Sequence, residues 1–168
     1  MKDIVQKRLD FYNPSNSNEE LNALKEITQE ISLYALYKTG FFQQASFIGG
    51  TNLRILHGLE RFSEDLDFST HQKNENFNLD LYLEKAISYM NAYGYDLSIA
   101  GSENADSNIK SRFLKDDSIK KILTFQHSQD FRSKIKVKVE VDINPPLGAT
   151  QKIEYIDFPL NYPVVAFD

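Results

Sequence analysis

The chain has 168 residues, 41% of them hydrophobic, and a formal net charge of −5. These values fit a single globular domain, residues 1–168, and argue against a protein that coats nucleic acid; the absence of cysteine excludes disulfides, zinc–thiolate sites and thiol nucleophiles. No apolar run has the length of a membrane span or a signal-peptide core, so we expect a cytoplasmic protein without a membrane partner.

Hydrophobic spacing and the positions of glycine and proline predict the order of elements along the chain. Helices are predicted over 1–12, 19–38, 52–59 and 79–93, and strands over 47–48, 65–68, 95–100, 120–126, 135–143, 152–158 and 163–167. Loops are predicted at 13–18, 71–78 and 101–108, and a polar turn at 127–130 is predicted to join strand 120–126 to strand 135–143 as an antiparallel pair. This order predicts an α+β fold, a mixed sheet with helices packed mainly on one side.

A glycine turn follows the first predicted strand. Gly49 and Gly50 come directly after the apolar segment 47–48, and Thr51 stands where the next helix begins. Glycine lets backbone N–H groups approach a ligand closely, and a helix start presents unpaired N–H groups to an anion. The turn is therefore a candidate phosphate site, in which the Thr51 hydroxyl either donates to phosphate or caps the helix.

Thirteen residues separate this turn from two alternating carboxylates. Asp65 and Asp67 alternate with Leu66 and Phe68, so a strand would turn both carboxylates to one face and both apolar side chains to the core. Adjacent carboxylates are a site for hard cations such as Mg²⁺, although a bare pair of this kind is more often solvated surface.

A third carboxylate is offered by the strand at 135–143, which alternates strictly between apolar and charged residues. Its polar face carries Lys136, Lys138, Glu140 and Asp142, which gives two rival candidates for the third metal ligand. The alternative is an amphipathic surface strand with cross-strand ion pairs.

The interval from Lys110 to Lys138 reverses the charge of the chain, with nine basic residues against three acidic ones, a balance of +6. These residues either contact a triphosphate or an RNA backbone, or they are solvated lysines on strands.

The segment 48–68 resembles the AbiEii/AbiGii toxin family of nucleotidyltransferase-like proteins. The family combines a glycine–glycine turn with a signature of Arg, aromatic, Ser, Glu, Asp, aliphatic and Asp, here Arg61 to Asp67, and often has a later strand that corresponds to Lys138–Val141. The resemblance runs from about residue 19 to residue 168, and the helical C-terminal half that usually follows in the family is absent from this sequence.

The resemblance implies a polymerase-β-like nucleotidyltransferase fold and an enzyme that moves a nucleotide from a nucleoside triphosphate to an RNA acceptor, typically tRNA, opposed by a cognate antitoxin. It implies two Mg²⁺ ions, held by Asp65, Asp67 and Glu140, with Asp142 as the rival catalytic carboxylate. The nucleotide-binding candidates are Gly49, Gly50, Thr51, Arg61, Ser63 and Lys138. Arg61 offsets developing charge or, as we favour, fixes the loop by pairing with Glu64.

Two alternatives stay open. One is a catalytically silent remnant that binds a metal–nucleotide complex or a protein, and the other is a transferase that acts on a small-molecule acceptor.

Overall fold

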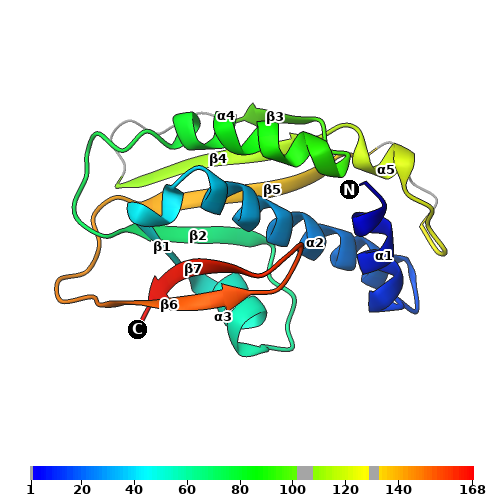
Figure 1. Ribbon diagram of the computed structural model, residues 1–168, viewed down its shortest axis with the longest axis horizontal. Helices are drawn as coiled ribbons and strands as arrows, with labels where there is room; N and C mark the ends of the chain where they lie inside the picture. The colour runs from blue at the N-terminus through cyan, green and yellow to red at the C-terminus, as the bar shows by residue number, and fades with distance from the viewer. Residues whose placement is uncertain (1, 102–107, 129–132) are drawn as a thin grey trace.

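The computed structural model describes residues 2–101, 108–128 and 133–168, and these residues form one seven-stranded sheet with five α-helices (Figure 1). The helices are α1 (Lys2–Tyr12), α2 (Ser17–Lys38), α3 (Gly49–His57), α4 (Leu79–Met90) and α5 (Ile119–Ile122), with two 3₁₀ turns, η1 (Phe41–Gln43) and η2 (Asn91–Tyr93). The strands are β1 (Ala45–Ile48), β2 (Asp65–Thr70), β3 (Leu97–Ala100), β4 (Ile109–Asp116), β5 (Ile135–Asp142), β6 (Gln151–Ile156) and β7 (Tyr162–Phe167).

The strands lie in the order β3-β4-β5-β2-β1-β7-β6. The two pairs β2–β5 and β1–β7 are parallel, and the other neighbours are antiparallel. The sheet is therefore mixed, as the sequence predicts, and the two strands with alternating carboxylates are central neighbours.

The core lies between one face of this sheet and the helices α2 and α4, which cross the same side of it in Figure 1. Helix α2 begins after Asn16, whose side chain accepts a hydrogen bond from the Glu19 N–H at 3.0 Å, and its residues Leu24, Ile27 and Ile31 are fully buried. Each such side chain contributes about 2 kcal/mol to the free energy of unfolding through its removal from water. Helix α3 lies behind β6 and β7 in Figure 1 and contacts β1, β2 and β6.

One predicted strand is wrong. Residues 120–122 belong to the short helix α5 and residues 123–126 form no strand. The antiparallel partner of β5 is β4, which the sequence interpretation did not find. The Asp116 carboxylate accepts hydrogen bonds from the N–H groups of Ser118, at 3.1 Å, and Ile119, at 2.7 Å, and so favours a helical turn there. The predicted turn at 127–130 and the predicted loop at 101–108 fall largely outside the described residues.

No helix among residues 2–101, 108–128 and 133–168 is long and apolar enough to cross a membrane.

A buried charged cluster joins α1 to α2. The Tyr12 hydroxyl lies 2.6 Å from Glu26 Oε1 and 3.2 Å from Glu30 Oε1, and Arg8 Nη2 lies 3.3 Å from Glu30 Oε2. Burial raises the pKa of Glu30 to about 7 and the Glu26 carboxylate adds to the rise, although Arg8 and Tyr12 lower it. Glu30 therefore costs more to ionise in the folded chain than in the unfolded one.

We expect this cluster to make the folded chain less stable as the pH rises. Glu30 loses its proton near pH 4.5 when unfolded and near pH 7 when folded, so the folded state binds the extra proton between these values. The Glu30 contribution to the free energy of unfolding should fall by about 2 kcal/mol between pH 5 and pH 8. Urea unfolding of the wild type and of Glu30→Gln isolates this contribution, because the other carboxylates are common to both; equal pH slopes would contradict it.

Candidate active site

The two predicted carboxylates of β2 share one face of the sheet. Asp65 and Asp67 are partly exposed, whereas Leu66 and Phe68 are fully buried on the opposite face. The prediction from alternation is confirmed for this strand. Its apolar side chains anchor it in the core, so the positions of both carboxylates are set by core packing.

The parallel pairing of β2 with β5 brings the third carboxylate to the same place. Asp65 pairs with Lys138 and Asp67 pairs with Glu140, and in parallel strands paired residues present their side chains on the same face. Residues that lie more than seventy positions apart in the sequence are thus direct neighbours. Three carboxylates and one ammonium group meet on two central strands.

The charges at this place repel one another. Burial raises the pKa of Asp67 to about 6, and the Glu140 and Asp65 carboxylates contribute to the rise. Burial also raises the pKa of Asp65, against an opposing effect of Lys138. A group of oxygen ligands with excess negative charge, partly withdrawn from water, is the environment in which a divalent cation is favourable.

Lys138 is the cation that partners this group in the structure. Its Nζ lies 2.7 Å from Glu140 Oε1 and 5.8 Å from the centre of the Phe113 ring, and the hydrogen bond to Glu140 raises the pKa of the lysine. Within the part of the chain that the structure describes, no three His, Cys, Asp or Glu side chains are arranged to hold a metal ion. Asp65, Asp67 and Glu140 are therefore neighbours, but in this structure their side chains are not arranged as a three-ligand group.

The rival carboxylate, Asp142, lies further along β5. It pairs with Ser69, and its Oδ1 accepts a hydrogen bond from the Asn144 N–H at 2.9 Å, at the start of the turn that follows the strand. Asp142 is thus two residues beyond Glu140, on the side away from Asp65. The register therefore places Glu140, and not Asp142, beside Asp67.

The glycine turn lies directly against the carboxylate of Asp67. Helix α3 begins at Gly49, whose φ is +82°, and a Cβ on this residue would lie 2.6 Å from Asp67 Oδ2. A Cβ on Gly50 would lie 3.1 Å from Ser63 Oγ. Side chains other than hydrogen therefore do not fit at Gly49 unless Asp67 moves. The start of α3, with its unpaired N–H groups, adjoins the carboxylate group.

Thr51 fastens this helix to β2. Its side chain is fully buried, its hydroxyl donates to the Asp65 carbonyl oxygen, and it lies 2.8 Å from Ser63 Oγ. The N-cap of α3 is Ile48, so Thr51 does not cap the helix. Because its hydroxyl already makes hydrogen bonds within the protein, Thr51 holds the start of α3 against β2.

The predicted pair between Arg61 and Glu64 is wrong. Glu64 Oε1 lies 3.7 Å from Lys25 Nζ on α2, and Arg61 is exposed. The loop before β2 is instead held by Arg54 of α3, which sequence reasoning missed because its ionic partner, Glu26, is twenty-eight residues earlier in the chain. No local pattern in the sequence marks this pair, because its two residues lie on different helices.

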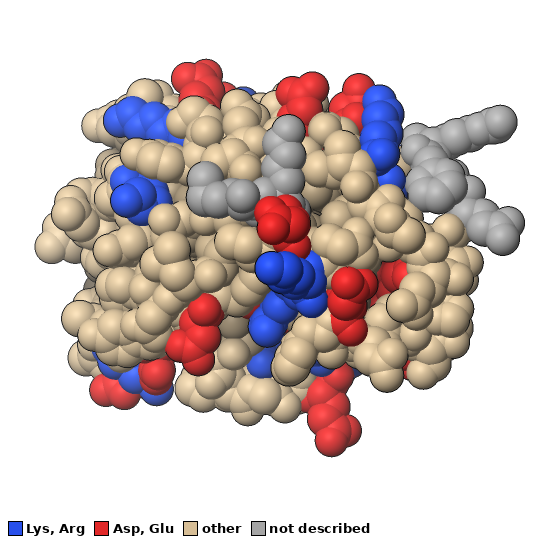
Figure 2. Space-filling model, turned by 45° about the vertical axis from the view of Figure 1, so that its right-hand side comes forward, with Lys and Arg blue, Asp and Glu red and all other residues tan. Residues whose placement is uncertain are grey.

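A basic groove of about 770 Å³ opens beside Asp65. Its charged and aromatic lining comes from α2, α5 and the neighbouring ends of β2, β4 and β5: Lys25, Glu64, Asp65, Phe113, Lys115, Lys120, Lys134, Lys136 and Lys138. Figure 2 shows that the face it presents carries both basic and acidic side chains, with a small group of basic ones near the centre.

Only part of the predicted basic interval belongs to this groove. Arg112 binds Asp80 of α4 through Nε and Nη2, at 2.9 and 3.1 Å, and Lys121 lies 3.7 Å from Asp117. Arg132 lies outside the described residues. Side chains alternate between the two faces of β4. Arg112 therefore lies on the face opposite Phe113 and Lys115, which line the groove.

Two solved structures resemble this chain. The chain resembles JHP933 from Helicobacter pylori with a TM-score of 0.52 and 22% identity, covering 88% of this chain and 53% of that one, and a candidate nucleotidyltransferase from H. pylori with a TM-score of 0.47 and 22% identity, covering 77% and 49%. The chain thus spans about half the length of these proteins, and the first likeness supports the predicted fold. No curated protein matches it.

The sequence also matches a protein family over residues 31–167, a span that includes the glycine turn, both carboxylates of β2, and β5. This family is described as the nucleotidyl transferase AbiEii toxin of type IV toxin–antitoxin systems. Because the match covers most of the chain, the protein belongs to the AbiEii nucleotidyltransferase toxin family.

Proposed function

We propose that this chain carries the catalytic site of a metal-dependent nucleotidyltransferase, which moves a nucleoside monophosphate from a nucleoside triphosphate to an acceptor, an RNA such as tRNA. The observation that carries the proposal is the position of Asp67, which the parallel register of β2 and β5 sets beside Glu140 and which lies against the glycine turn. Family membership supports the reaction class.

Asp65, Asp67 and Glu140 are the residues that would hold divalent metal. They fit this role because they supply only oxygen ligands. Burial, together with the Glu140 and Asp65 carboxylates, raises the pKa of Asp67, and a cation would relieve the repulsion among the three. Mg²⁺ bound there, two ions in our proposal, would neutralise phosphate oxygens and favour attack at the α-phosphorus. Glu140 has to exchange its Lys138 partner for this role.

Lys138 and the glycine turn are assigned to the triphosphate. Lys138 carries a positive charge beside the carboxylates, and Gly49 and Gly50 leave the start of α3 open to an anion. Ser63 Oγ borders Gly50 and is a candidate for contact with the same phosphate. Arg61 is exposed on the adjoining loop and stays a candidate for phosphate contact.

The basic groove is assigned to the polyanionic substrates. Six lysines line it against two acidic residues, and it begins at Asp65, so a phosphate backbone can lie along it and end at the carboxylates. For the whole protein, we propose a cognate antitoxin as partner and the cytoplasm as the place of action, both from the family.

The register predicts unequal effects for the two carboxylates of β5. Glu140→Gln should lower transfer by at least about a hundredfold, because it removes a metal ligand, whereas Asp142→Asn should lower it less than about fivefold. Initial rates of both variants at saturating Mg²⁺ and nucleotide decide the assignment. Equal losses, or a larger loss in Asp142→Asn, would contradict it.

Transfer of label from each α-labelled triphosphate to total tRNA, with Mg²⁺ or with chelator, tests the proposed function. We expect labelled tRNA only with divalent metal. Labelled small molecules in place of RNA, with an aminoglycoside as the trial acceptor, would point to the second alternative. Nucleotide binding seen by calorimetry without any transfer would support the silent remnant. This outcome has to be excluded because Glu140 is paired with Lys138 in the structure.

A further inference from the structure

The loop between α3 and β2, residues 58–64, leads directly into Asp65. Helix α3 ends with hydrogen bonds from the Gly58 N–H to the Arg54 carbonyl and from the Leu59 N–H to the Leu53 carbonyl, both 3.1 Å. Beyond Leu59 the loop has no regular structure until β2 begins. Its course is therefore set by side chains that reach it from elsewhere.

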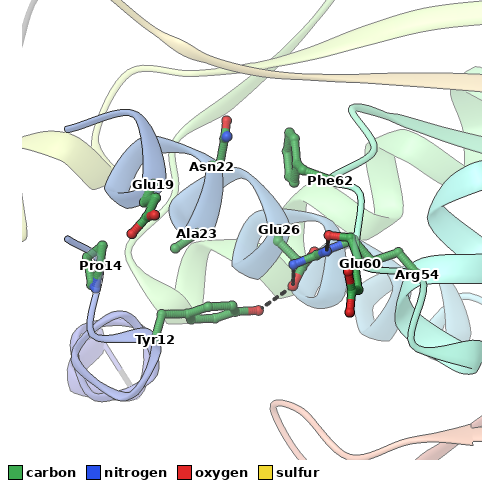
Figure 3. Close-up of a pocket in the computed structure, with 9 residues that line it drawn as sticks. All are labelled: Tyr12, Pro14, Glu19, Asn22, Ala23, Glu26, Arg54, Glu60 and Phe62. Carbon is green, nitrogen blue, oxygen red and sulfur yellow. Dashed lines mark hydrogen bonds and ion pairs between the residues drawn. The ribbon is translucent and has the colours of Figure 1, made fainter. Parts of the chain in front are cut away.

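Arg54 is the main one of these side chains. Its Nη1 donates to the carbonyl oxygens of Leu59, at 3.2 Å, and Glu60, at 2.5 Å, while its Nε and Nη2 bind the carboxylate of Glu26 on α2. Figure 3 shows the guanidinium of Arg54 between Glu26 and Glu60, at one end of a pocket of about 330 Å³. One planar group thus connects α3, the loop and α2.

Helix α2 holds the other end of the same loop. The Gln29 Nε2 donates to the Ser63 carbonyl at 2.8 Å, and Lys25 lies 3.7 Å from Glu64. Glu26 is itself fixed, because the Tyr12 hydroxyl donates to it at 2.6 Å (Figure 3). The loop is consequently attached to a core helix on both sides of Arg61.

We propose that Arg54 is a positioning residue for nucleotidyl transfer, acting through loop 58–64 on Ser63 and Asp65. This inference rests on the proposed function. A shift of the loop would move Ser63, which borders Gly50, and Asp65, whose carbonyl binds the Thr51 hydroxyl. The hydrogen bonds of Arg54 go to Glu26, Leu59 and Glu60, and Arg54 does not line the groove. Its proposed effect on the reaction is therefore indirect.

The test compares Arg54→Lys with Arg112→Lys. Lysine keeps the charge but cannot bind a carboxylate and two carbonyls with one planar group, so Arg54→Lys should lower kcat about thirtyfold or more and change the KM for the triphosphate less than about threefold. Arg112 binds Asp80 with the same two-pronged geometry, between β4 and α4, and its substitution should leave kcat within about twofold.

A second measurement reads the loop without the reaction. Arg61 is exposed in the loop, so trypsin cleavage after it should be about tenfold faster in Arg54→Lys and in Glu26→Gln than in the wild type, and unchanged in Arg112→Lys. Glu26→Gln keeps the volume of the side chain and provides a second variant if Arg54→Lys fails to fold.

The outcomes separate the two claims. A wild type that transfers nucleotide, with unchanged kcat in Arg54→Lys and Glu26→Gln, would overturn the positioning role alone. The same holds if Arg112→Lys lowers kcat as much as Arg54→Lys. A wild type that transfers nothing would overturn the proposed function, and the positioning role with it.

Discussion

Asp67→Asn should abolish nucleotidyl transfer without unfolding the protein. Asn cannot supply the anionic oxygen that a hard divalent cation prefers, and Asp67 is the carboxylate closest to both Gly49 and Glu140. We expect the rate to fall by at least about a thousandfold, the order of effect when several kcal/mol of transition-state stabilisation are lost. The rate of label transfer at saturating metal and nucleotide is the measurement.

Stability distinguishes this loss from misfolding. The pKa of Asp67 is raised to about 6, so the ionised form is disfavoured in the folded chain, and Asn should leave the free energy of unfolding at pH 7 unchanged or higher. Asp157→Asn is the matched control, because Asp157 is exposed and its Oδ1 only accepts a hydrogen bond from Asn161. If Asp67→Asn keeps transfer within tenfold of the wild type, the assignment of the site is wrong.

Gly49→Ala should lower transfer by about a hundredfold or more. The new Cβ would lie 2.6 Å from Asp67 Oδ2 and 3.0 Å from Asp67 Cβ, so the Asp67 carboxylate has to move. Displacements of about 1 Å at a reacting centre cost about two orders of magnitude in rate. Steady-state rates should show the loss mainly in kcat.

Gly148→Ala separates this clash from backbone strain. Gly148 has a φ of +77°, close to the +82° of Gly49, but a Cβ there meets nothing within 4 Å. Both substitutions should destabilise the fold by about 1 kcal/mol through the positive φ, and Gly49→Ala by more. Normal transfer in Gly49→Ala, or a similar loss in Gly148→Ala, would contradict the proposed contact with Asp67.

Much of the central sheet could be predicted from the sequence because its strands alternate strictly. In β5 the apolar residues Val137, Val139 and Val141 are buried and the charged ones face outward, and β2 repeats the pattern with Leu66 and Phe68. Local period determines which face a side chain takes. It therefore predicted that Asp65 and Asp67 share one face of β2, and that Lys138, Glu140 and Asp142 share one face of β5.

What the sequence did not provide were contacts between distant segments. Strand β4 escaped prediction because its polar residues are themselves engaged: Arg112 on one face binds Asp80, and Lys115 on the other lines the groove. The parallel register that places Glu140 rather than Asp142 beside Asp67, and the pairing of Arg54 with Glu26, depend on packing across the domain. Neither feature is marked by a local periodicity in the sequence.

Anomalous density from a crystal soaked with Mn²⁺ and a non-hydrolysable nucleoside triphosphate tests the central claim most directly. We predict manganese between the carboxylates of Asp65, Asp67 and Glu140, at about 2.2 Å from their oxygens, with the triphosphate against Gly49 and Gly50 and with Lys138 released from Glu140. Manganese bound elsewhere, or a nucleotide bound without metal at these three residues, would contradict it.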